Sequence, residues 1–214
     1  PSTAAVAISG TDATGLFQLN GAQYVTFDGR IGSTGSTNLL TITNTHASSP
    51  VFLFINDAQN NNIRYASLKS DNSSTTSGVV LFSTTTGSNG NDNNTIDNCN
   101  IGPNSGNPTN GIYSAGTSAT TAQNNSSNTI SNNNIFDFYN SSSSTNGGTG
   151  VNLSSGSTDW TVTGNSFYQM ASRTSFGAGA TVSAINITNT SGANFIVSGN
   201  YVGGSATQCG GSAY

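Results

Sequence analysis

The sequence is almost without charge, and this absence excludes whole classes of protein. Only 6% of its 214 residues are Asp, Glu, Lys or Arg, against roughly 25% in an ordinary soluble domain. It has no glutamate, and its four basic residues are scattered along the chain. A nucleic-acid groove needs clustered Lys and Arg to neutralise phosphates, so the formal net charge of -4 argues against a nucleic-acid partner.

Long apolar runs are also missing. No run approaches the roughly 18 residues of a membrane-spanning helix, so we expect no membrane span. No charged segment followed by an apolar one opens the chain, which starts at Pro1, and we expect a mature, processed chain or a module of a larger protein. The richness in Asn, Ser, Thr and Gly would suit disorder. The apolar residues, however, recur in short, evenly spaced clusters, which a folded chain explains better.

Cysteine is limited to Cys99 and Cys209, too few for a zinc site or a disulfide framework. Cys99 lies within an apolar rhythm, which favours a buried free thiol. If the two residues lie three coils apart, they are ~14 Å apart along the axis. That exceeds the ~7 Å limit between bridged Cα atoms, so a disulfide would require the C-terminal tail to fold back.

What the sequence does contain is a repeat. The repeated unit is a six-residue phrase that begins and ends with an apolar residue and has polar residues, mostly Asn, Ser or Gly, between them. Examples are Ile96–Ile101 and Ile130–Ile135. The first residues of the copies, which we call anchors, lie 32 to 36 residues apart: Phe27, Ile63, Ile96, Ile130, Val162 and Val197. The copy that starts at Phe27 ends at Ile31, one residue short. A second apolar phrase lies between the anchors, at residues 15–19, 50–54, 78–81, 111–113, 150–153 and 184–187.

This period is shared by helical repeats, but the composition is wrong for them. No segment has apolar residues at helical spacing over ten residues, and β-branched residues, Gly and Asn replace the usual helix formers. Short strands between Asn/Gly/Ser turns at a long period indicate a solenoid of β-coils. We therefore predict an all-β fold, a right-handed parallel β-helix of about six coils. It forms a single domain over 1–214, with a cap or lead-in at 1–14, coils at 15–203 and a tail or linker at 204–214.

Asn is expected at the corners, because it tolerates left-handed backbone angles and its side chain bonds the nearby backbone. Equivalent Asn residues on successive coils would then form ladders, as identical side chains do in cross-β stacks. We predict such pairs between Asn98 and Asn132 and between Asn165 and Asn200.

Phrases of the type Asn-x-Ile-x-x-Asn-x-Ile, at residues 94–101 and 128–135, resemble the parallel β-helix repeats of the pectin-lyase-like superfamily. The resemblance covers roughly residues 15–203 and implies a fold, since that superfamily includes polysaccharide lyases, glycosidases, tailspikes and adhesins. The Ser/Thr/Asn/Gly-rich texture is also similar to repeat modules in secreted bacterial surface proteins. The Asp-Asp, Asn-Thr-Asp and His-Gly signatures of pectin-degrading members are absent, and the single histidine, His46, is expected in a solvated loop.

One charged arrangement follows from the repeat. Asp28, Arg64 and Asp97 each follow the anchor of their coil, so we predict that they stand in a row on the outer face. They are candidates for a sugar- or calcium-binding cluster. The favoured interpretation is an ion-pair row without chemistry, because an arginine between two carboxylates opposes cation binding and exposed pairs contribute only about 0–1 kcal/mol.

Aromatic rings are the other binding candidates, because a flat ring gives apolar contact with a sugar face. The candidates are Trp160, Tyr113, Tyr168 and Tyr201; Trp160 lies two residues before its anchor and has an inward, core-facing alternative. The Thr-rich strands 41–43 and 161–163 also resemble ice-binding solenoids, but the residues after the anchors do not form a uniform Thr array.

These observations favour a non-catalytic structural or adhesive module at the cell surface or outside the cell. Its expected partners are a polysaccharide or neighbouring surface-protein modules, and we expect no cofactor, metal or catalytic residue. The main alternative is a polysaccharide-active β-helix enzyme, a lyase or glycosidase with an unrecognised acid pair. Ice binding is the third possibility.

Overall fold

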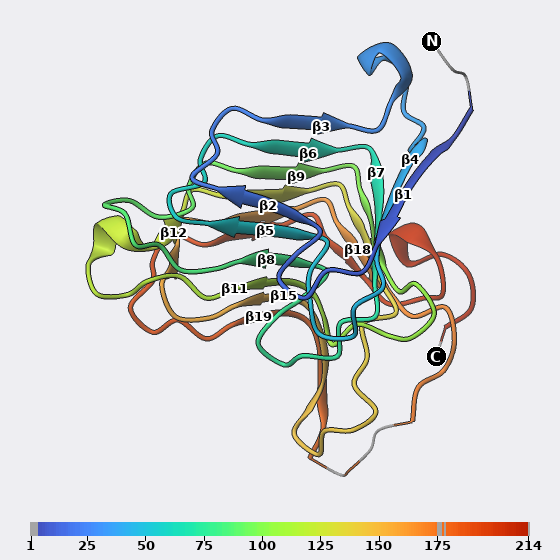
Figure 1. The fold of residues 1–214 in the computed structure, drawn as a ribbon. Helices are drawn as coiled ribbons and strands as arrows, with labels where there is room; N and C mark the ends of the chain where they lie inside the picture. The colour runs from blue at the N-terminus through green and yellow to red at the C-terminus, as the bar shows by residue number, and fades with distance from the viewer. Residues whose placement is uncertain (1–3, 175–176, 178, 214) are drawn as a thin grey trace.

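The chain folds as a parallel β-solenoid of about six turns, seen in a computed structural model that describes residues 4–174, 177 and 179–213 (Figure 1). Each turn contributes one strand to each of three parallel sheets, and successive turns stack along the solenoid axis. The only helical elements among the described residues are three short 3-10 turns, η1 (Ile31–Ser33), η2 (Thr121–Gln123) and η3 (Thr207–Cys209). The all-β, parallel-coil prediction is confirmed.

The strands fall into three long sheets and one short one. Sheet 1 contains β1 (Val6–Gly10), β4 (Leu40–Asn44), β7 (Ala66–Ser70), β10 (Asn100–Gly102), β14 (Asn134–Phe136), β18 (Ser166–Tyr168) and β21 (Tyr201–Val202). Sheet 2 contains β2 (Phe17–Asn20), β5 (Phe52–Ile55), β8 (Val80–Phe82), β11 (Asn110–Ser114), β15 (Asn146–Leu153) and β19 (Thr181–Ile187). Sheet 3 contains β3 (Thr26–Asp28), β6 (Asn62–Arg64), β9 (Thr95–Asp97), β13 (Thr129–Ser131), β17 (Thr161–Thr163) and β20 (Ile196–Ser198). The short sheet pairs β12 (Asn125–Ser126) with β16 (Ser157–Thr158).

The strand register confirms the repeat read from the sequence. The six anchors pair with one another from coil to coil down sheet 3. The second apolar phrase does the same in sheet 2, where Phe17 pairs with Phe52 and Val80 with Ile112. In every copy but the first, the apolar residue that closes the copy lies in sheet 1, as Ile101 pairs with Ile135. One repeat is therefore one turn of the solenoid.

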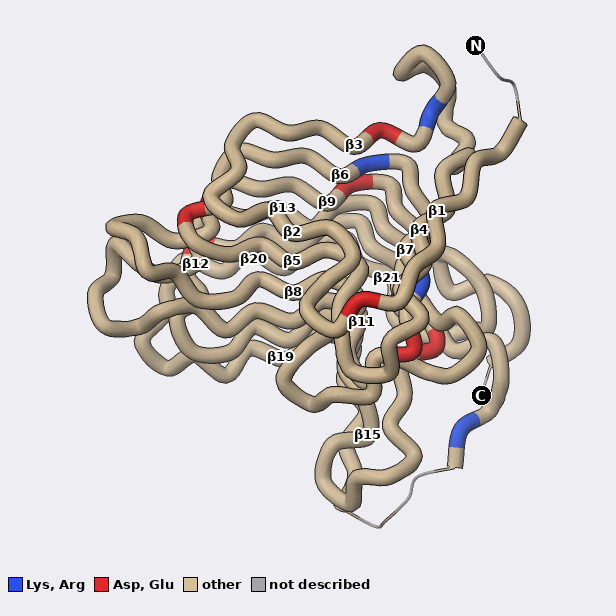
Figure 2. The backbone as a smooth tube through the Cα atoms, in the orientation of Figure 1, with Lys and Arg blue, Asp and Glu red and all other residues tan. Residues whose placement is uncertain are grey.

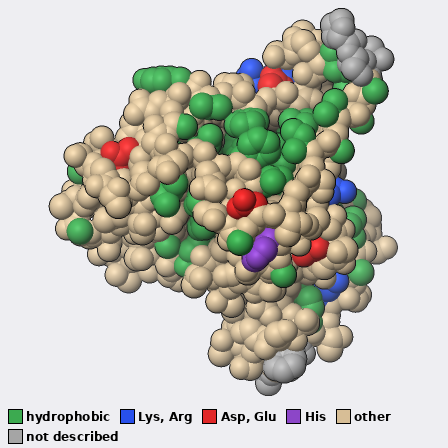
Figure 3. All heavy atoms as spheres, in the orientation of Figure 1, with side chains coloured by type: hydrophobic (Ala, Val, Ile, Leu, Met, Phe, Trp, Pro, Cys, Tyr) green, Lys and Arg blue, Asp and Glu red, His purple; other side chains and the backbone are tan. Residues whose placement is uncertain are grey.

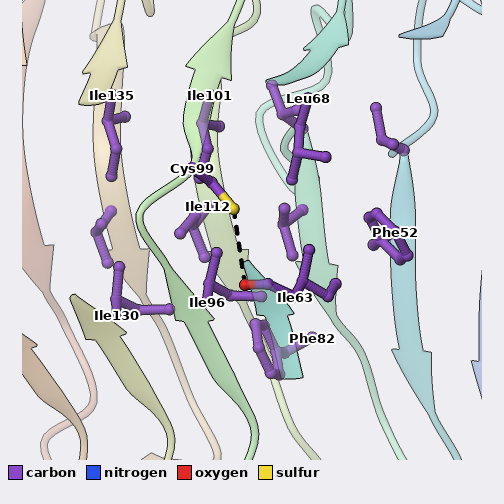
Figure 4. Close-up of a cluster of buried hydrophobic side chains, with 14 of the residues drawn as sticks. Phe52, Ile63, Leu68, Phe82, Ile96, Cys99, Ile101, Ile112, Ile130 and Ile135 are labelled. Carbon is purple, nitrogen blue, oxygen red and sulfur yellow. Dashed lines mark hydrogen bonds between the residues drawn. The ribbon is translucent and has the colours of Figure 1, made fainter. Parts of the chain in front are cut away.

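The core consists of columns of apolar side chains that point into the solenoid and stack on their equivalents one turn away. Figure 4 shows this for Ile96 and Ile130 from sheet 3 and for Ile101 and Ile135 from sheet 1. Outward residues alternate with them, as a half-buried strand requires. Burial of such side chains in several columns at once is the main favourable contribution to folding.

Both cysteines are free thiols, as the sequence favoured for Cys99. Cys99 is fully buried in the core, and its thiol lies 3.6 Å from the backbone oxygen of Ile63 (Figure 4). Burial raises the pKa of this thiol to about 12. Cys209, in η3, is exposed.

The corners on both sides of sheet 3 use left-handed backbone angles. On one side this conformation is held by Asn60, Asn93 and Ser127, and on the other by Asn98, Asn132 and Gly164. Asn and Gly adopt such angles at little cost, which explains why the repeat carries them at most of these corners, although Ser127 and Tyr65 hold the same angle.

The residue after each corner points inward, and this position forms the asparagine ladders. Asn133 donates from Nδ2 to Oδ1 of Asn165 at 2.9 Å, and Asn165 donates to Asn200 at 3.0 Å. The predicted pair Asn165–Asn200 is therefore confirmed. The predicted pair Asn98–Asn132 is wrong, because these two residues occupy the left-handed corner itself and their side chains lie outside the solenoid, where both bond to Asp97.

The copy that starts at Phe27 departs from the prediction. Ile31 does not enter sheet 1 but begins η1, and the strand position is taken by Ile42, which pairs with Leu68. Backbone bonds join Gly29 to Arg64 and Leu39 to Gly29. The residues between Gly29 and Leu39 thus form an inserted loop, which we call the 30–38 loop, that leaves the solenoid and returns to it at the same corner.

Both ends of the chain carry local structure. Within the stretch predicted as a lead-in, β1 pairs with β4 as the first strand of sheet 1. In the predicted tail, Ala206 and Gly210 form a β-bridge around η3, and the backbone N–H of Gln208 donates to Oγ of Ser166 in β18. None of the described helical turns has the length and apolar character of a membrane-crossing helix.

Candidate functional site

A polar groove runs along the outer surface of sheet 1 where it meets the corner after sheet 3. It consists of two adjoining hollows of about 480 Å³ and about 370 Å³, which share Asn98, Asn132 and Asn134 as lining residues. The first hollow is completed by Ser36, Thr37, Asn38 and Asn100, and the second by Gly164, Ser166, Thr207 and Gln208. We call the two together the amide groove.

The floor of the groove is built by the repeat. Asn100 and Asn134 are the first residues of β10 and β14, and they point outward because their neighbours Ile101 and Ile135 are buried in the core. The two strands are adjacent in sheet 1, and Nδ2 of Asn134 donates to Oδ1 of Asn100 at 2.8 Å. The result is a short row of amides across neighbouring coils.

Asp97 orients the two corner asparagines beside this row. Its carboxylate accepts hydrogen bonds from Nδ2 of Asn98 at 2.6 Å and from Nδ2 of Asn132 at 3.0 Å. It also accepts one from Oγ of Ser131 at 2.7 Å. A carboxylate that accepts three hydrogen bonds holds its donors firmly, so Asp97 fixes the amides that line the groove.

Segments far apart in the sequence form the two walls. The 30–38 loop forms one, and Nδ2 of Asn38 donates to the backbone oxygen of Asn98 at 3.0 Å, which ties this loop to the groove. The turn η3 forms the other through Thr207 and Gln208. Gln208 is held by the 2.9 Å bond from its backbone N–H to Ser166.

None of the residues that line the amide groove is ionisable. The groove therefore offers amide and hydroxyl groups, which both donate and accept hydrogen bonds. It contains no pair of carboxyl groups of the kind that glycosidases use to cleave a sugar bond.

An aromatic pair borders the groove on the same outer surface. Phe136 and Tyr168 lie two residues beyond Asn134 and Ser166 in adjacent strands, and they pair in register. Their rings are stacked with centroids 5.4 Å apart and planes 11° apart. Both side chains are half-buried, and burial raises the pKa of the Tyr168 hydroxyl.

The row of Asp28, Arg64 and Asp97 lies where the repeat predicted it. The three residues pair in register on β3, β6 and β9, and Figure 2 shows their alternating charges on neighbouring strands. Asp28 is held by two guanidinium groups, with Nη2 of Arg30 at 2.8 Å and Nε of Arg64 at 3.0 Å. The hydrogen bond from Arg30 keeps the pKa of Asp28 well below its usual range.

Arg30 comes from the 30–38 loop, and the sequence analysis missed it as a member of this row. Its guanidinium also lies 4.0 Å from the centroid of the Tyr65 ring, a cation–π contact. The ion pair between Arg30 and Asp28 thus fixes the 30–38 loop, which forms one wall of the amide groove. Asp97, at the end of the row, accepts hydrogen bonds from Asn98 and Asn132, which line the groove. The row and the groove are one connected structure.

The remaining aromatic candidates divide by burial. Trp160 is fully buried: its Nε1 donates to the backbone oxygen of Asn125 at 2.9 Å, and its ring packs edge-on against Phe82 at 4.9 Å. This is the core-facing alternative for Trp160. Tyr113 is also buried. Tyr201 is exposed and pairs in register with Ser166, so it continues the outer surface of sheet 1 beyond the groove.

Other titratable groups serve local structure. Asp71 accepts backbone bonds from Asn104, Ser105 and Gly106 in the next coil, and Asp12 accepts them from Thr14 and Gly15. Nδ1 of His46 lies 3.1 Å from Oγ of Ser49 in the turn between β4 and β5. Among the described residues, no three His, Cys, Asp or Glu side chains lie close enough together to hold a metal ion.

One sequence pattern could have predicted the floor of the amide groove but was not interpreted that way. The triplets 98–100 and 132–134 place Asn on both sides of a buried position, and they recur one turn apart. The 30–38 loop and Gln208 had no such signal, because their position over the groove depends on how distant parts of the chain fold back. No protein-family model, curated protein or solved structure matches this chain.

Proposed function

We propose that this chain is a non-catalytic module of an extracellular or cell-surface protein, and that it binds an uncharged polysaccharide in the amide groove. The observation that carries the proposal is the lining of the groove, which consists of amide and hydroxyl side chains without an ionisable group. The resemblance of the repeat to the pectin-lyase-like superfamily, which includes carbohydrate-active and adhesive proteins, supports the same class of ligand.

The geometry suits a sugar chain in two ways. Asn100 and Asn134 repeat at the ~4.8 Å spacing of neighbouring strands, so successive amides can bond successive hydroxyl groups along an extended glycan. The ring of Tyr168, stacked on Phe136, offers apolar contact to a sugar face at small entropic cost. A neutral glycan meets no charged side chain among the residues that line this groove, whereas an acidic glycan would find no arginine or lysine there to pair with.

Binding can be measured by calorimetric titration of the full 214-residue chain with a panel of neutral polysaccharides. We expect Asn134→Ala and Tyr168→Ala to weaken binding by about fivefold or more, since a good hydrogen bond or aromatic contact contributes about 1 kcal/mol or more. Asn186→Ala is the matched control, because Asn186 donates to Asn152 at 3.4 Å on a different sheet of the same solenoid. Equal loss of binding in all three variants, or no binding to any neutral glycan, would contradict the proposal.

The same panel, extended to pectins and alginates, tests the enzyme alternative. The proposal expects no cleavage of any of these polymers by the wild-type chain. Turnover that disappears when Asp28, Arg64 and Asp97 are replaced by Ala would show that the charged row is catalytic and would overturn the non-enzyme assignment.

One observation favours ice binding as a second candidate. Thr95, Thr129 and Thr161 pair in register on the outer surface of sheet 3, one position before the anchors. Ser131 and Thr163 form a second row beside them. Thermal hysteresis that is present in the wild type and lost in Thr129→Lys would support this function instead of glycan binding.

A further inference from the structure

A second polar hollow lies at the other corner of sheet 3, before its strands begin. It has a volume of about 300 Å³ and is lined by parts of three successive coils: the loop that contains η2, the turn between β15 and β16, and the turn after β19. In Figure 1 the η2 loop is the yellow-green segment with a coiled ribbon that projects beyond β12. We call this hollow the corner pocket. It shares no lining residue with the amide groove.

The lengths of neighbouring loops explain why a hollow forms here. The loop between β11 and β12 covers residues 115–124, whereas the turn between β15 and β16 covers only residues 154–156. A long loop beside a short turn leaves a recess on the coil with the short turn. Both sides are held in place: Nε2 of Gln123 donates to the backbone oxygen of Gly87 at 2.8 Å, and Nδ2 of Asn189 donates to that of Ser157 at 2.7 Å. Such a pre-formed pocket loses little entropy when it binds a ligand.

Asn124 is the buried polar side chain of the corner pocket. It is only 6% exposed and lines the pocket. Its amide makes no hydrogen bond with any residue that the structure describes, and the amide atoms are not among the fully enclosed ones, so they face the hollow. Buried side-chain amides nearly always have a hydrogen-bond partner. An unpaired amide that faces a hollow therefore indicates a partner from outside the chain.

The next residue shows what this position lacks. Asn125 is fully buried in an asparagine ladder, where its Oδ1 accepts a hydrogen bond from Nδ2 of Asn91 at 2.9 Å. The residues equivalent to Asn124 in the coils before and after it are Gly90 and Gly156. Neither glycine has a side chain with which the amide of Asn124 could pair. The repeat thus interrupts the ladder at this one column and leaves a free amide in the pocket.

The rest of the lining is rich in hydroxyl groups. Six Ser and Thr side chains line the pocket without a side-chain hydrogen bond to the described chain: Ser118, Thr121, Ser155, Thr188, Thr190 and Ser191. No lining residue is ionisable or aromatic, so the pocket offers neither a counter-charge for an ionic ligand nor a ring for a flat one. On the face drawn in Figure 3, Lys and Arg side chains (blue) lie away from the η2 loop, where the surface is mostly tan.

We propose that the corner pocket binds a small uncharged polyol, such as a single sugar unit, through two neighbouring hydroxyl groups that bond the amide of Asn124. One ligand hydroxyl donates to Oδ1 and the next accepts from Nδ2, while the Ser and Thr hydroxyls bond the remaining groups, since each can donate and accept. A volume of about 300 Å³ is at the lower end of the range for small-molecule sites, which suits one unit and not an extended chain.

Nuclear magnetic resonance of the isotope-labelled full chain tests this site directly. Titration with D-glucose, D-galactose, D-mannose and glycerol should shift the side-chain NH₂ signals of Asn124 and the backbone signals of the lining residues. For at least one of these probes the shifts should saturate below about 100 mM. No saturable shift with any of the four, or equal shifts of Ser and Thr residues all round the solenoid, would overturn the proposal.

Two variants test the pocket from opposite sides. Asn124→Ala and Thr188→Val should each weaken binding of the best probe by at least about fivefold, because each removes a hydrogen-bonding group of the site. Neither side chain bonds another described residue, so both variants should keep the fold, which circular dichroism checks. Wild-type affinity in Asn124→Ala would overturn the proposal.

Asn134→Ala, on the floor of the amide groove, is the matched control and should bind the small probes like the wild type. Loss of the shifts in this variant would place the ligand in the amide groove and overturn the proposal. Asn124→Ala should in turn bind neutral polysaccharides in the amide groove unchanged, so the two sites can fail independently. A free sugar and the terminal unit of a glycan present the same hydroxyl groups; an oligosaccharide that shifts the same signals more strongly than its free unit would identify the glycan end as the ligand, and weaker shifts would identify the free sugar.

Discussion

Asn132, Asn133 and Asn134 are three identical residues in a row, and the structure predicts a different response to substitution at each. Asn132 holds a left-handed corner with φ of 55°, Asn133 is buried in a ladder, and Asn134 lies on the groove floor. The chemistry of the side chain is the same in all three, so differences in stability report position alone.

The largest loss is expected for Asn133→Ala. Oδ1 of Asn133 is the acceptor for the backbone N–H of Cys99 at 2.8 Å, and its Nδ2 donates to the backbone oxygen of Ile96 and to Asn165, both at 2.9 Å. Truncation leaves the buried N–H of Cys99 unpaired, at a cost of about 1–3 kcal/mol, and removes two further hydrogen bonds of about 0.5–1.5 kcal/mol each. The free energy of unfolding should fall by about 2–6 kcal/mol.

The neighbours should respond less or differently. Asn134→Ala removes one partly exposed bond to Asn100 and should cost at most about 1 kcal/mol. Asn132→Gly keeps the left-handed angle and loses only the exposed 3.0 Å bond to Asp97, so it should cost at most about 1 kcal/mol. Asn132→Val also loses this bond and strains the corner, which should add about 1–2 kcal/mol.

Urea unfolding measures all four variants, and Trp160, the single tryptophan and fully buried, provides the fluorescence signal. Comparable slopes with urea are needed before midpoints are converted to free energies. A loss for Asn133→Ala no larger than that for Asn134→Ala would refute the ladder as a source of stability.

Three further predictions follow from buried groups. Ile130→Asp should unfold the chain, because an unpaired carboxylate in the core costs several kcal/mol. Ser131→Asp replaces the Oγ hydrogen bond to Asp97 with a second carboxylate on the outer surface and should cost much less, about 1–2 kcal/mol; similar melting temperatures for the two variants would show the inward assignment to be mistaken. A thiol reagent should modify Cys209 in the native chain but Cys99 only after urea unfolding, since burial raises the pKa of Cys99 to about 12. Because the pKa of Asp28 is lowered from its ordinary value of 3.8, the ionised carboxylate stabilises the fold at pH values above 3.8, and this stabilisation is lost as the pH falls from 3.8 toward the lowered pKa. Asp28→Asn should therefore make the free energy of unfolding fall less steeply in this acidic range. A pH dependence equal to that of the wild type would contradict the ion pairs of Asp28 with Arg30 and Arg64.

Much of the fold could be predicted because the information is local and repeated. The alternation of inward and outward residues in a strand has a period of two, so an apolar anchor such as Ile96 identifies its own side of the sheet. Repetition at one turn then aligns Ile96 with Ile130 without further information. The row of Asp28, Arg64 and Asp97 followed from the same register.

Adjacent asparagines could not be told apart in this way. Which of Asn132 and Asn133 enters the ladder depends on the backbone angle at the corner, because the left-handed residue directs its side chain outward and turns the next one inward. The sequence supplies the same residue type at both positions. The choice is made by the hydrogen bonds that the coils above and below offer, such as the backbone N–H of Cys99.

The candidate site belongs to the tertiary structure for a related reason. The sequence by itself determined the repeat, the core columns and the outward row of charge, which all depend on neighbours along a strand or one turn away. Only the folded chain brought Asn38 and Gln208 to the same groove, because loops have no period that records where they return. It also placed Val197 and Val202 in the last coil that the structure describes, where they are exposed although their sequence pattern matches that of the buried Ile130 and Ile135.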